Sequence, residues 1–550
     1  MSDLRLQQAT KLHQENKLDE AERLYREVIA GAPEHGEALY LLGTLLTQRG
    51  ADDEAMRLFD RALAANPGHV VARISRGNAL LAGDRPKEAL ADFDEALGLM
   101  TPFLAALNSR GGALRQLGRL DEALSSFDLA LSIQPNSAMV HSNRGVVLRE
   151  LGRLEESLAA VDEAVRLQPD SPAFIYNRSD TLRELERYPE AIAGYDRALA
   201  LLPNFADALI GRGLALMNAR NLDQAQASFQ SALALHPNDP RARLDASVCS
   251  LLAGDLAGGF PNYEARWLNP PNSGWKRDFA QPLWLGKEDI AGKTILLHGE
   301  QGLGDSIQFC RYATLVAERG ARVILEVHAP LTRLMKSLAG PAQVIAYGET
   351  LPPFDLHCPL MSLPLAFGTT AAKIPAVVPY LSAESQLVPR WQERLGAPKK
   401  KRRVGLVWSG GRLLKNDRNR SIPLPRLAPL LTHDAQFVSL HKELRPGDAE
   451  WMAASGRISH FAGEQQDFAD TAALINLMDV VVSVDTAVAH LAGAMGKQVY
   501  ILLPHVGVDW RWRLEGDESP WYPTARLFRQ PSAGDWDSAI ARVGAALAAP

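Results

Sequence analysis

The sequence predicts an α-solenoid of repeated helical hairpins followed by an α/β region with two parallel sheets. Three observations lead to this prediction. Small, aromatic and proline residues recur at a spacing of 34 residues through roughly the first 240 positions. The helical period is interrupted near residue 270. From Thr294 onward, short apolar runs alternate with helical stretches, which is the pattern of βα units in a parallel sheet.

The length and composition of the chain limit the classes of protein to consider. A chain of 550 residues is too long for one hydrophobic core and predicts several domains. The apolar content of 46% and charged content of 22% are ordinary for a globular protein, and the net charge of -5 gives no reason to expect nucleic-acid binding. The three cysteines lie far apart and form neither a disulfide framework nor a metal motif.

The sequence shows no targeting segment or membrane span. The stretch from Met1 to Lys17 is polar and lacks the apolar core of a signal peptide. The most apolar late stretch, Val480 to Met495, is too short to cross a bilayer and contains an aspartate and a histidine. We therefore expect a cytoplasmic protein without a membrane span.

Two series of residues and a recurring proline define the repeated unit. Small residues occupy Gly43, Gly77, Gly111, Gly145, Ser179 and Gly213, and aromatic residues occupy Tyr25, Phe59, Phe93, Phe127, Tyr195 and Phe229. Small residues allow two helices to approach closely, the aromatic side chain fills the space between them, and a proline ends the second helix. This pattern resembles the tetratricopeptide repeat. It predicts a superhelix over residues 1–270, with seven clear repeats and a degenerate eighth at Asn238–Leu268.

A solenoid of this kind has a concave groove. The resemblance implies that certain first-helix positions line it, namely Asn78, Asn108, Arg115, Arg149, Asp180 and Arg183. The functional interpretation is a polar, partly basic trough that holds an extended acidic or hydroxyl-rich segment of a partner protein. The alternative is that these arginines are simply solvated. A second series, Arg76, Arg110, Arg144, Arg178 and Arg212, is interpreted as structural.

The remaining boundaries follow from the change in pattern. A run of Pro, Asn, Ser and Gly after Leu268 breaks the helices, so residues 271–290 are interpreted as a linker. Residues 291–395 and 396–550 are then two Rossmann-like domains.

In the first α/β domain, the strand Thr294–His298 leads into a turn that contains Gly302, Gly304 and Asp305. A glycine-rich turn lets backbone amides approach a ligand, as in dinucleotide-binding proteins. Here the third glycine of that fingerprint is replaced by Ile307, and Asp305 would meet the pyrophosphate. A carboxylate in this place better suits a base that faces a hydroxyl acceptor, although an aspartate here can also merely cap the helix.

The second α/β domain places polar residues after its strands. Asp485 and Thr486 follow the strand Val480–Val484, and His490 comes one helical turn later. Ligands bind at such strand ends, where Thr486 and backbone amides can hold a phosphate. Upstream, Ser409 ends the strand that starts at Arg403. A basic loop follows it, with Arg412, Lys415, Arg418 and Arg420. Ser409 and this loop are candidates for binding the donor phosphates, and the alternative for the loop is a solvated turn. Two Rossmann-like domains in series, the second rich in groups that bind phosphate, are typical of the GT-B fold of glycosyltransferases.

Residues 294–545 resemble glycosyltransferase family 9, the heptosyltransferase-like enzymes. The residues that carry the resemblance are Gly304-Asp305 and Ser483-Val484-Asp485-Thr486, followed by His490-Leu491. The resemblance implies that Asp305 is the general base and that Asp485, Thr486 and His490 bind the donor diphosphate. The family places a lysine ahead of an aromatic-proline pair; by the position of Pro423 this chain has Arg420 there, and Lys415 could share its role.

The implied reaction is direct displacement at the anomeric carbon of a nucleotide-diphosphate sugar, without a metal or another cofactor. The order of repeats and catalytic domain resembles O-linked N-acetylglucosamine transferases and flagellin glycosyltransferases, so a protein acceptor bound by the repeats is expected. Two alternatives remain. One is transfer to a lipid-linked saccharide, and the other is a scaffold whose α/β region has lost catalysis.

Overall fold

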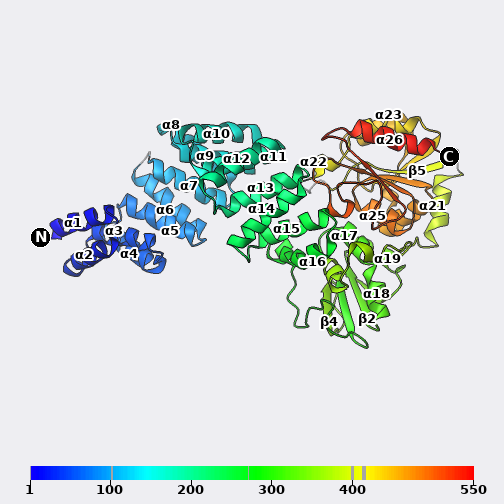
Figure 1. Ribbon diagram of the computed structural model, residues 1–550, viewed down its shortest axis with the longest axis horizontal. Helices are drawn as coiled ribbons and strands as arrows, with labels where there is room; N and C mark the ends of the chain where they lie inside the picture. Colours follow the sequence, from blue (N-terminus) through cyan, green and yellow to red (C-terminus); the bar gives the residue numbers. More distant parts are fainter. Residues whose placement is uncertain (1, 101–102, 270–271, 398–401, 412–415, 550) are drawn as a thin grey trace. The chain divides into compact units, whose positions relative to one another are not determined.

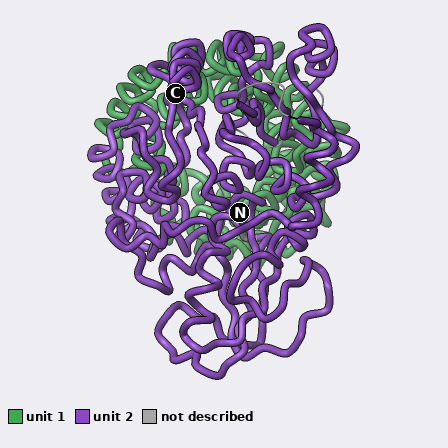
Figure 2. The backbone as a smooth tube through the Cα atoms, turned by 90° about the vertical axis from the view of Figure 1, so that its right-hand side faces the viewer, with its two compact units in different colours: residues 1–212 green, residues 213–550 purple. Residues whose placement is uncertain are grey.

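The computed structural model describes residues 2–100, 103–269, 272–397, 402–411 and 416–549. It divides the chain into two compact units, unit 1 up to Arg212 and unit 2 from Gly213 (Figure 2). The predicted boundary at residue 270 therefore differs from the boundary between the units, because the last repeats pack with the α/β region. Each unit is described by itself below.

The repeat region consists of helical hairpins, as the 34-residue period predicts (Figure 1). The helices of unit 1 are α1 (Ser2–Gln14), α2 (Leu18–Gly31), α3 (Gly36–Gln48), α4 (Asp52–Ala65), α5 (Val70–Ala82), α6 (Pro86–Leu99), α7 (Leu104–Gln116), α8 (Leu120–Ile133), α9 (Ala138–Glu150), α10 (Leu154–Leu167), α11 (Pro172–Glu184) and α12 (Tyr188–Leu201). Helix α13 (Ala206–Asn218) spans the boundary, and α14 (Leu222–Leu235), α15 (Pro240–Leu252) and α16 (Leu256–Tyr263) belong to unit 2. The degenerate eighth repeat is thus a helical hairpin, α15–α16.

The small residues of the period let the two helices of each hairpin touch. A Cβ atom added at Gly111 would lie 2.5 Å from the ring of Phe127, and one at Gly77 would lie 2.5 Å from the ring of Phe93. Phe93 and Phe127 are almost fully buried. The aromatic ring therefore occupies the space that the glycine leaves open, which is the role expected from the sequence.

This close approach predicts opposite effects for two neighbouring substitutions in α7. Gly111→Ala should destabilise unit 1 by about 1–3 kcal/mol, because its methyl group overlaps the ring of Phe127. Gly112→Ala is the matched control, since nothing lies within 4 Å of the added atom. It should stabilise the helix by up to about 1 kcal/mol. Urea denaturation followed by circular dichroism measures both changes, and a shift of the same sign in both variants would refute the close contact.

The second arginine series connects successive repeats. Arg110 in α7 donates to Asp94 in α6 at 2.6 Å, and Arg144 in α9 donates to Asp128 in α8 at 2.6 Å. The same pairing, sixteen residues apart, recurs at Arg76–Asp60, Arg178–Asp162 and Arg212–Asp196. The interpretation of this series as structural agrees with these ion pairs between neighbouring hairpins.

The first sheet of unit 2 is wholly parallel. It contains β1 (Thr294–His298), β2 (Arg322–Val327), β3 (Pro341–Ala346) and β4 (Leu356–Pro359), in the order β3-β2-β1-β4. Both of its faces are covered, since Leu297 and Leu325 point into the main core while Leu296 and Ile324 pack under Phe279 on the other side. Helices α17 (Leu303–Phe309), α18 (Tyr312–Glu318), α19 (Thr332–Met335) and α20 (Leu363–Ala366) accompany it. Apolar strands buried on both faces are typical of parallel sheets.

The second sheet is also parallel, which confirms that the C-terminal region is α/β. Its strands are β5 (Arg402–Val407), β6 (Ala435–Ser439), β7 (Ile458–Ser459), β8 (Val480–Val484), β9 (Val499–Leu503) and β10 (Ala525–Arg529). Their order is β10-β9-β8-β5-β6-β7. The helices are α22 (Asp417–Arg420), α23 (Asp448–Ser455), α24 (Phe468–Asn476), α25 (Ala487–Ala494) and α26 (Trp536–Ala548). The chain winds outward in both directions from β5 and β8, so the topological switch point lies between these two strands.

Two predicted boundaries within unit 2 need correction. The segment interpreted as a linker is packed, because Leu283 bridges to His357 and the fully buried Trp284 donates its backbone N–H to the His357 carbonyl. Helix α21 (Leu387–Leu395), assigned by its sequence position to the first α/β domain, instead packs on α24 of the second. There Trp391 Nε1 donates to Asp470 Oδ1 at 3.0 Å.

The last repeat is part of the α/β core. One cluster of buried side chains includes Leu251 of α15, Leu297 of β1 and Val481 of β8. The 3₁₀ segment Glu264–Leu268 that follows α16 adds Arg266, which is 0% exposed and donates to both carboxylate oxygens of Glu300 at 3.0 and 2.8 Å. Unit 2 is therefore a single packed body of repeat helices and sheets.

Candidate functional site

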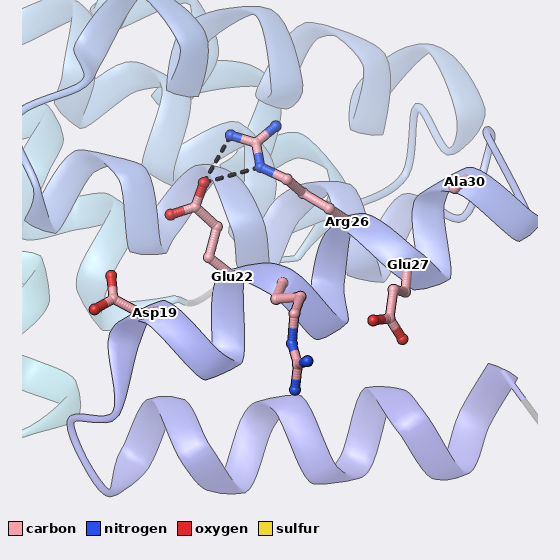
Figure 3. A pocket seen from close by; sticks show the side chains of 6 residues that line it. Asp19, Glu22, Arg26, Glu27 and Ala30 are labelled. Carbon is pink, nitrogen blue, oxygen red and sulfur yellow. Dashed lines mark hydrogen bonds and ion pairs between the residues drawn. The ribbon is translucent and has the colours of Figure 1, made fainter.

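Two pockets on the described residues differ in the chemistry of the side chains that line them. The first, of about 520 Å³, lies on α2 and is lined by charged side chains that include Asp19, Glu22, Arg26 and Glu27 (Figure 3). Arg26 pairs there with Glu22 at 2.8 Å and with Glu54 at 2.9 Å. These are exposed surface ion pairs, which contribute little and carry no chemistry.

The second hollow, of about 950 Å³, lies within unit 2 and collects groups that can bind and react. Its lining comes from the loop after β1, the loops after β5, β6 and β8, the segment around Trp510 and the last repeat. We take this pocket as the candidate site, because it lies at the switch point where ligands bind in parallel sheets.

The pocket brings together most of the α/β residues singled out in the sequence. It is lined by Gly302, Gly304, Asp305, Ser409, Arg420, Asp485, Thr486 and His490. Lys415 and Arg412 lie outside the described residues. Ser409 follows β5 and Asp485 follows β8, the two strands at the switch point, whereas Asp305 comes from the first sheet. The two α/β parts thus contribute to one site.

Asp305 lies near the start of α17 and has two partners. Its Oδ2 accepts a hydrogen bond from the Gly302 backbone N–H at 2.9 Å, so it does cap the helix, as the structural interpretation of the sequence expected. Its Oδ1 accepts from Arg511 Nη2. Burial raises the pKa of the Asp305 carboxyl group above its ordinary value, although Arg511 opposes this shift. A raised pKa makes this carboxylate a stronger base than an ordinary aspartate.

Arg511 is a site residue that sequence reasoning missed. What the sequence shows here is two tryptophans, Trp510 and Trp512, flanking the arginine, and such aromatic residues are typical of packing rather than of a site. Trp512 is indeed fully buried, whereas Trp510 and Arg511 line the pocket. Arg511 is 5% exposed and also pairs with Asp509 at 2.9 Å. The arginine therefore links the C-terminal segment to the loop that carries Asp305.

His490 contacts both α/β parts. Its Nδ1 lies 3.0 Å from the Tyr522 hydroxyl, and its ring stacks on Trp512 with centroids 5.1 Å apart. A Cβ atom at Gly304 would lie 3.0 Å from His490 Cδ2, so glycine is needed where α17 approaches α25. Burial lowers the pKa of His490 well below its ordinary value, and the cations Arg511 and Arg311 add to this. The imidazole is therefore neutral at pH 7.

Asp485 and Thr486 form the turn between β8 and α25. Arg420 Nη1 donates to the Asp485 carbonyl at 3.2 Å, and Thr486 Oγ1 lies 3.1 Å from Ser483 Oγ. Arg420 also packs on Gly410, where an added Cβ atom would lie 2.3 Å from its guanidinium. These contacts hold a cation beside the first amides of α25, an arrangement that can bind an anion such as phosphate.

Burial raises the pKa of Asp485 to about 6, and the carboxylate of Asp509 adds to this shift. The Trp512 indole, Arg420 and Arg511 act in the opposite direction. Asp485 is therefore largely ionised at pH 7 but takes up a proton in mildly acidic solution.

This pKa predicts a pH-dependent stability. A carboxyl group whose pKa rises from 3.8 to about 6 on folding stabilises the fold fully below about pH 4, and the contribution is lost as the pH rises through about 6. A shift of this size corresponds to at most roughly 3 kcal/mol. The variant Asp485→Asn should accordingly gain stability relative to the parent as the pH increases from about 4 to about 7. Urea denaturation across this range measures the difference, and a difference independent of pH would contradict the assignment.

Further pocket residues carried no signal in the sequence. Lys442 follows β6, donates from Nζ to the Gln466 carbonyl at 2.8 Å and lines the same pocket as Arg420. His441 accepts the Trp408 N–H at 3.0 Å, and burial lowers its pKa to about 3. Gln301, Trp275, Val248 and Tyr263 also line the pocket. Isolated residues in loops and helices form no periodic or motif-like pattern, so only the folded chain identifies them.

No group of three or more His, Cys, Asp or Glu side chains arranged to hold a metal ion occurs within the described ranges. Over the same ranges, no helix combines the length and the apolar character needed to cross a bilayer.

The predicted groove residues lie in unit 1, apart from the pocket. Asp180 is buried and accepts from Arg149 Nη1 at 2.6 Å, from Tyr195 at 2.6 Å and from Arg183 at 3.4 Å. Burial alone would raise the pKa of Asp180, but Arg183 and Arg149 hold it below its ordinary value. These two arginines are therefore already paired within the repeats.

The remaining groove positions are more accessible. Arg115 pairs with Glu150 at 2.8 Å across two repeats, and Asn108 Oδ1 accepts from Asn143 at 2.9 Å. Asn78 is exposed. The groove positions thus offer mainly amides and paired charges, rather than the unpaired basic trough that an acidic ligand would favour.

Comparison with known proteins identifies the repeats. Family models described as tetratricopeptide repeat match residues 12–74, 74–138, 142–206 and 210–273. This confirms the prediction that the N-terminal part of the chain is a tetratricopeptide-repeat solenoid. Such stacked helical repeats present extended concave binding surfaces, and this part of the chain is accordingly a protein-interaction region.

The match to a curated relative covers only part of this chain and only part of the relative. Protein FlbA of Caulobacter vibrioides is 26% identical over 327 residues, or 54% of this chain, and the chain spans about half (53%) of the length of that curated relative.

Solved structures give similar partial matches. A tetratricopeptide repeat protein from Parabacteroides merdae is 18% identical, with a TM-score of 0.40, over 45% of this chain and 98% of its own. YrrB, a repeat protein with an unusual peptide-binding site, is 22% identical with a TM-score of 0.28 over 34% of this chain and 95% of its own. PilF of Pseudomonas aeruginosa is 22% identical with a TM-score of 0.34 over 39% and 97%.

Proposed function

We propose that the chain is a glycosyltransferase that moves a sugar from a nucleotide-diphosphate donor to a hydroxyl group of a protein, with a GT-B arrangement of its two α/β parts. One observation carries this proposal. In a single pocket, the half-buried carboxylate of Asp305, at the start of α17 after the first strand, lies together with a phosphate-type site made by Arg420, Thr486 and the start of α25 from the second sheet. A base on one wall and an anion site on the other suit group transfer between two substrates.

We assign the residues of the pocket two roles in the reaction, deprotonation of the acceptor and stabilisation of the leaving group. Asp305 accepts the proton of the acceptor hydroxyl as its oxygen forms a bond to the anomeric carbon. The bond between that carbon and the phosphate oxygen breaks at the same time, and the nucleoside diphosphate leaves with the bonding electrons. Arg420, Lys442 and the first amides of α25 stabilise the negative charge of the leaving group. Displacement on one face of the sugar inverts the anomeric configuration.

Two features support a protein as the acceptor. The repeats are a protein-interaction region, and the last of them contributes Val248 and Tyr263 to the pocket itself. A saccharide acceptor on a lipid would need no such array. Protein binding by the repeats and transfer in the pocket are then parts of one activity.

Nucleotide binding by the full chain tests the proposal. Thermal shift with ADP, UDP, GDP, CDP and CMP, each with EDTA present, should show selective stabilisation by one of them, because the phosphates need no metal where Arg420 and Lys442 neutralise them. Arg420→Met should weaken binding by about 10-fold or more, the loss of one charge-assisted contact. Lys373→Met, which removes an exposed cation outside the pocket, is the matched control.

A shift that persists in Arg420→Met would place the nucleotide elsewhere. If none of the five nucleotides stabilises the chain, the proposal fails, and the protein is better described as an interaction scaffold whose α/β part no longer binds a donor.

A further inference from the structure

The loop between β1 and Asp305 contains an unusual residue, Gln301. Its φ angle is 55°, which is the left-handed region that non-glycine residues rarely adopt. Its side chain lines the pocket, and its amide Nε2 is buried without a hydrogen-bond partner among the described residues. Buried amide donors are normally satisfied, so Gln301 Nε2 offers an unused donor in the wall of the pocket.

The neighbouring contacts explain why this conformation persists. Glu300, one residue before Gln301, is 2% exposed and accepts from Arg266 and from the Met361 backbone N–H at 3.2 Å. One residue after Gln301, the Gly302 N–H is bound by Asp305. The chain is therefore held on both sides of Gln301, whose side chain lines the same pocket as the Asp305 carboxylate.

The end of the repeat array faces the same part of the pocket. Val248 of α15 and Tyr263 of α16 line it, and Phe260 packs edge-on against Trp510 with centroids 5.7 Å apart. Tyr263 is 8% exposed, and Asp305 and Arg511 are close enough to act on its hydroxyl group. Burial raises the pKa of Tyr263 to about 12, so the hydroxyl keeps its proton and can donate a hydrogen bond.

The groups suited to a nucleotide diphosphate lie on the other side. Arg420, Lys442 and Thr486 all come from loops of the second sheet, whereas Gln301, Tyr263 and Val248 come from the first-sheet loop and the last repeat. Asp305 lines the same pocket as both sets. On the second-sheet side the cations Arg420 and Lys442 line the pocket together with the carboxylates Asp467 and Asp485, whereas the other side offers neutral donors and an apolar side chain.

We infer that Gln301, Tyr263 and Val248 form the acceptor subsite, and that its occupant is an extended polypeptide segment with a serine or threonine hydroxyl. The inference rests on the proposed function. Gln301 Nε2 donates to a backbone carbonyl of the segment next to the reacting residue, which places the hydroxyl at Asp305. Val248 and Tyr263 contact the flanking side chain. An amide donor beside an apolar contact matches a peptide backbone, which alternates carbonyl groups with side chains, better than it matches a charged ligand.

Photo-cross-linking of the full chain tests this assignment without requiring turnover. The probes are synthetic peptides with a central serine or threonine, randomised flanks and a benzophenone amino acid next to the hydroxyl residue. After irradiation and trypsin digestion, cross-links should concentrate in the fragments 244–266 and 294–311, which contain Val248 with Tyr263 and Gln301 respectively.

Three variants test whether cross-linking depends on the Gln301 amide. Gln301→Met keeps the side-chain length and removes the amide, so cross-linking to these fragments should fall about 10-fold while nucleotide binding by thermal shift is unchanged. Lys442→Met should instead weaken nucleotide binding and leave cross-linking to these fragments unchanged. Gln392→Met makes the same chemical change at an exposed position of α21 and should alter neither.

The outcomes separate the two proposals. Cross-links that stay within unit 1, or a Gln301→Met variant that loses nucleotide binding but not cross-linking, overturn the acceptor subsite. Correct cross-links that depend on Gln301, in a chain that binds none of the nucleotides, uphold a peptide site and refute the transferase.

Discussion

Asp305→Asn is expected to lower sugar transfer by about 10²–10⁴-fold, the range that a positioned general base contributes. Asparagine keeps the shape of the side chain and can still accept the Gly302 N–H, but it cannot take the proton of an acceptor hydroxyl. Nucleotide binding should persist, because the cations of the donor half lie on the loops of the second sheet. Release of nucleoside diphosphate with a peptide acceptor measures the loss.

Asp509→Asn is the matched control for this experiment. Asp509 and Asp305 both pair with Arg511, so each variant leaves that buried arginine with one carboxylate. The two substitutions should therefore change thermal stability by similar amounts, whereas only Asp305→Asn removes the base. Equal loss of transfer in both variants would show that Asp305 acts only through Arg511.

The pH dependence of transfer gives a second check. Because burial raises the pKa of Asp305, the carboxylate needed as base forms only as the pH rises through that raised value. Transfer should therefore decline in acidic solution below that value, and the residual activity of Asp305→Asn should not show the same decline.

Arg266→Met is expected to destabilise unit 2 by about 3–5 kcal/mol, because it leaves the carboxylate of Glu300 buried without its cation. Arg266 is 0% exposed and binds Glu300, the Ser362 hydroxyl at 2.7 Å and Glu264 at 2.6 Å. The substitution also frees the loop that carries Gln301 and Asp305, so nucleotide release with a peptide acceptor should fall with it. Chemical denaturation of the full chain measures the stability.

The double variant Arg266→Met with Glu300→Gln separates charge from packing. It removes the charges of Arg266 and Glu300, and it should recover part of the stability lost in Arg266→Met, since Glu300 is then no longer an unpaired buried charge, while Glu264, 20% exposed, still accepts from the Ser362 hydroxyl. Arg322→Met removes an exposed arginine at the start of β2, and its effect should stay within about 0.5 kcal/mol. A double variant less stable than Arg266→Met would mean that the pair is not the source of the effect.

The repeats could be predicted almost completely from the sequence. Each glycine, aromatic and proline of the period acts on a partner within the same hairpin, as Gly111 does on Phe127, so the contact is encoded by a fixed spacing. The apolar strands were recognisable for a similar reason, because strands buried on both faces form continuous apolar runs. The degenerate eighth hairpin followed from the same register.

The predicted residues of the pocket were those that follow a strand directly. Asp305 after β1 and Asp485 with Thr486 after β8 could be identified because the carboxyl ends of parallel strands hold ligands. Their roles in binding and catalysis remain predictions. The prediction for the groove arginines was less complete, since the sequence could not reveal that Arg149 and Arg183 both pair with the buried Asp180.

The sequence by itself determined the helical hairpins, the two α/β parts and the strand ends that carry polar groups, since each depends on neighbours within one repeat or one βα unit. Only the tertiary structure decided that Arg511 pairs with Asp305, that Arg266 holds Glu300 and that Tyr263 of the last repeat reaches the pocket. The partners in the first pair are more than 200 residues apart in the chain. The free energy of such a contact comes from removing both groups from water together, and no local spacing records which distant segments meet.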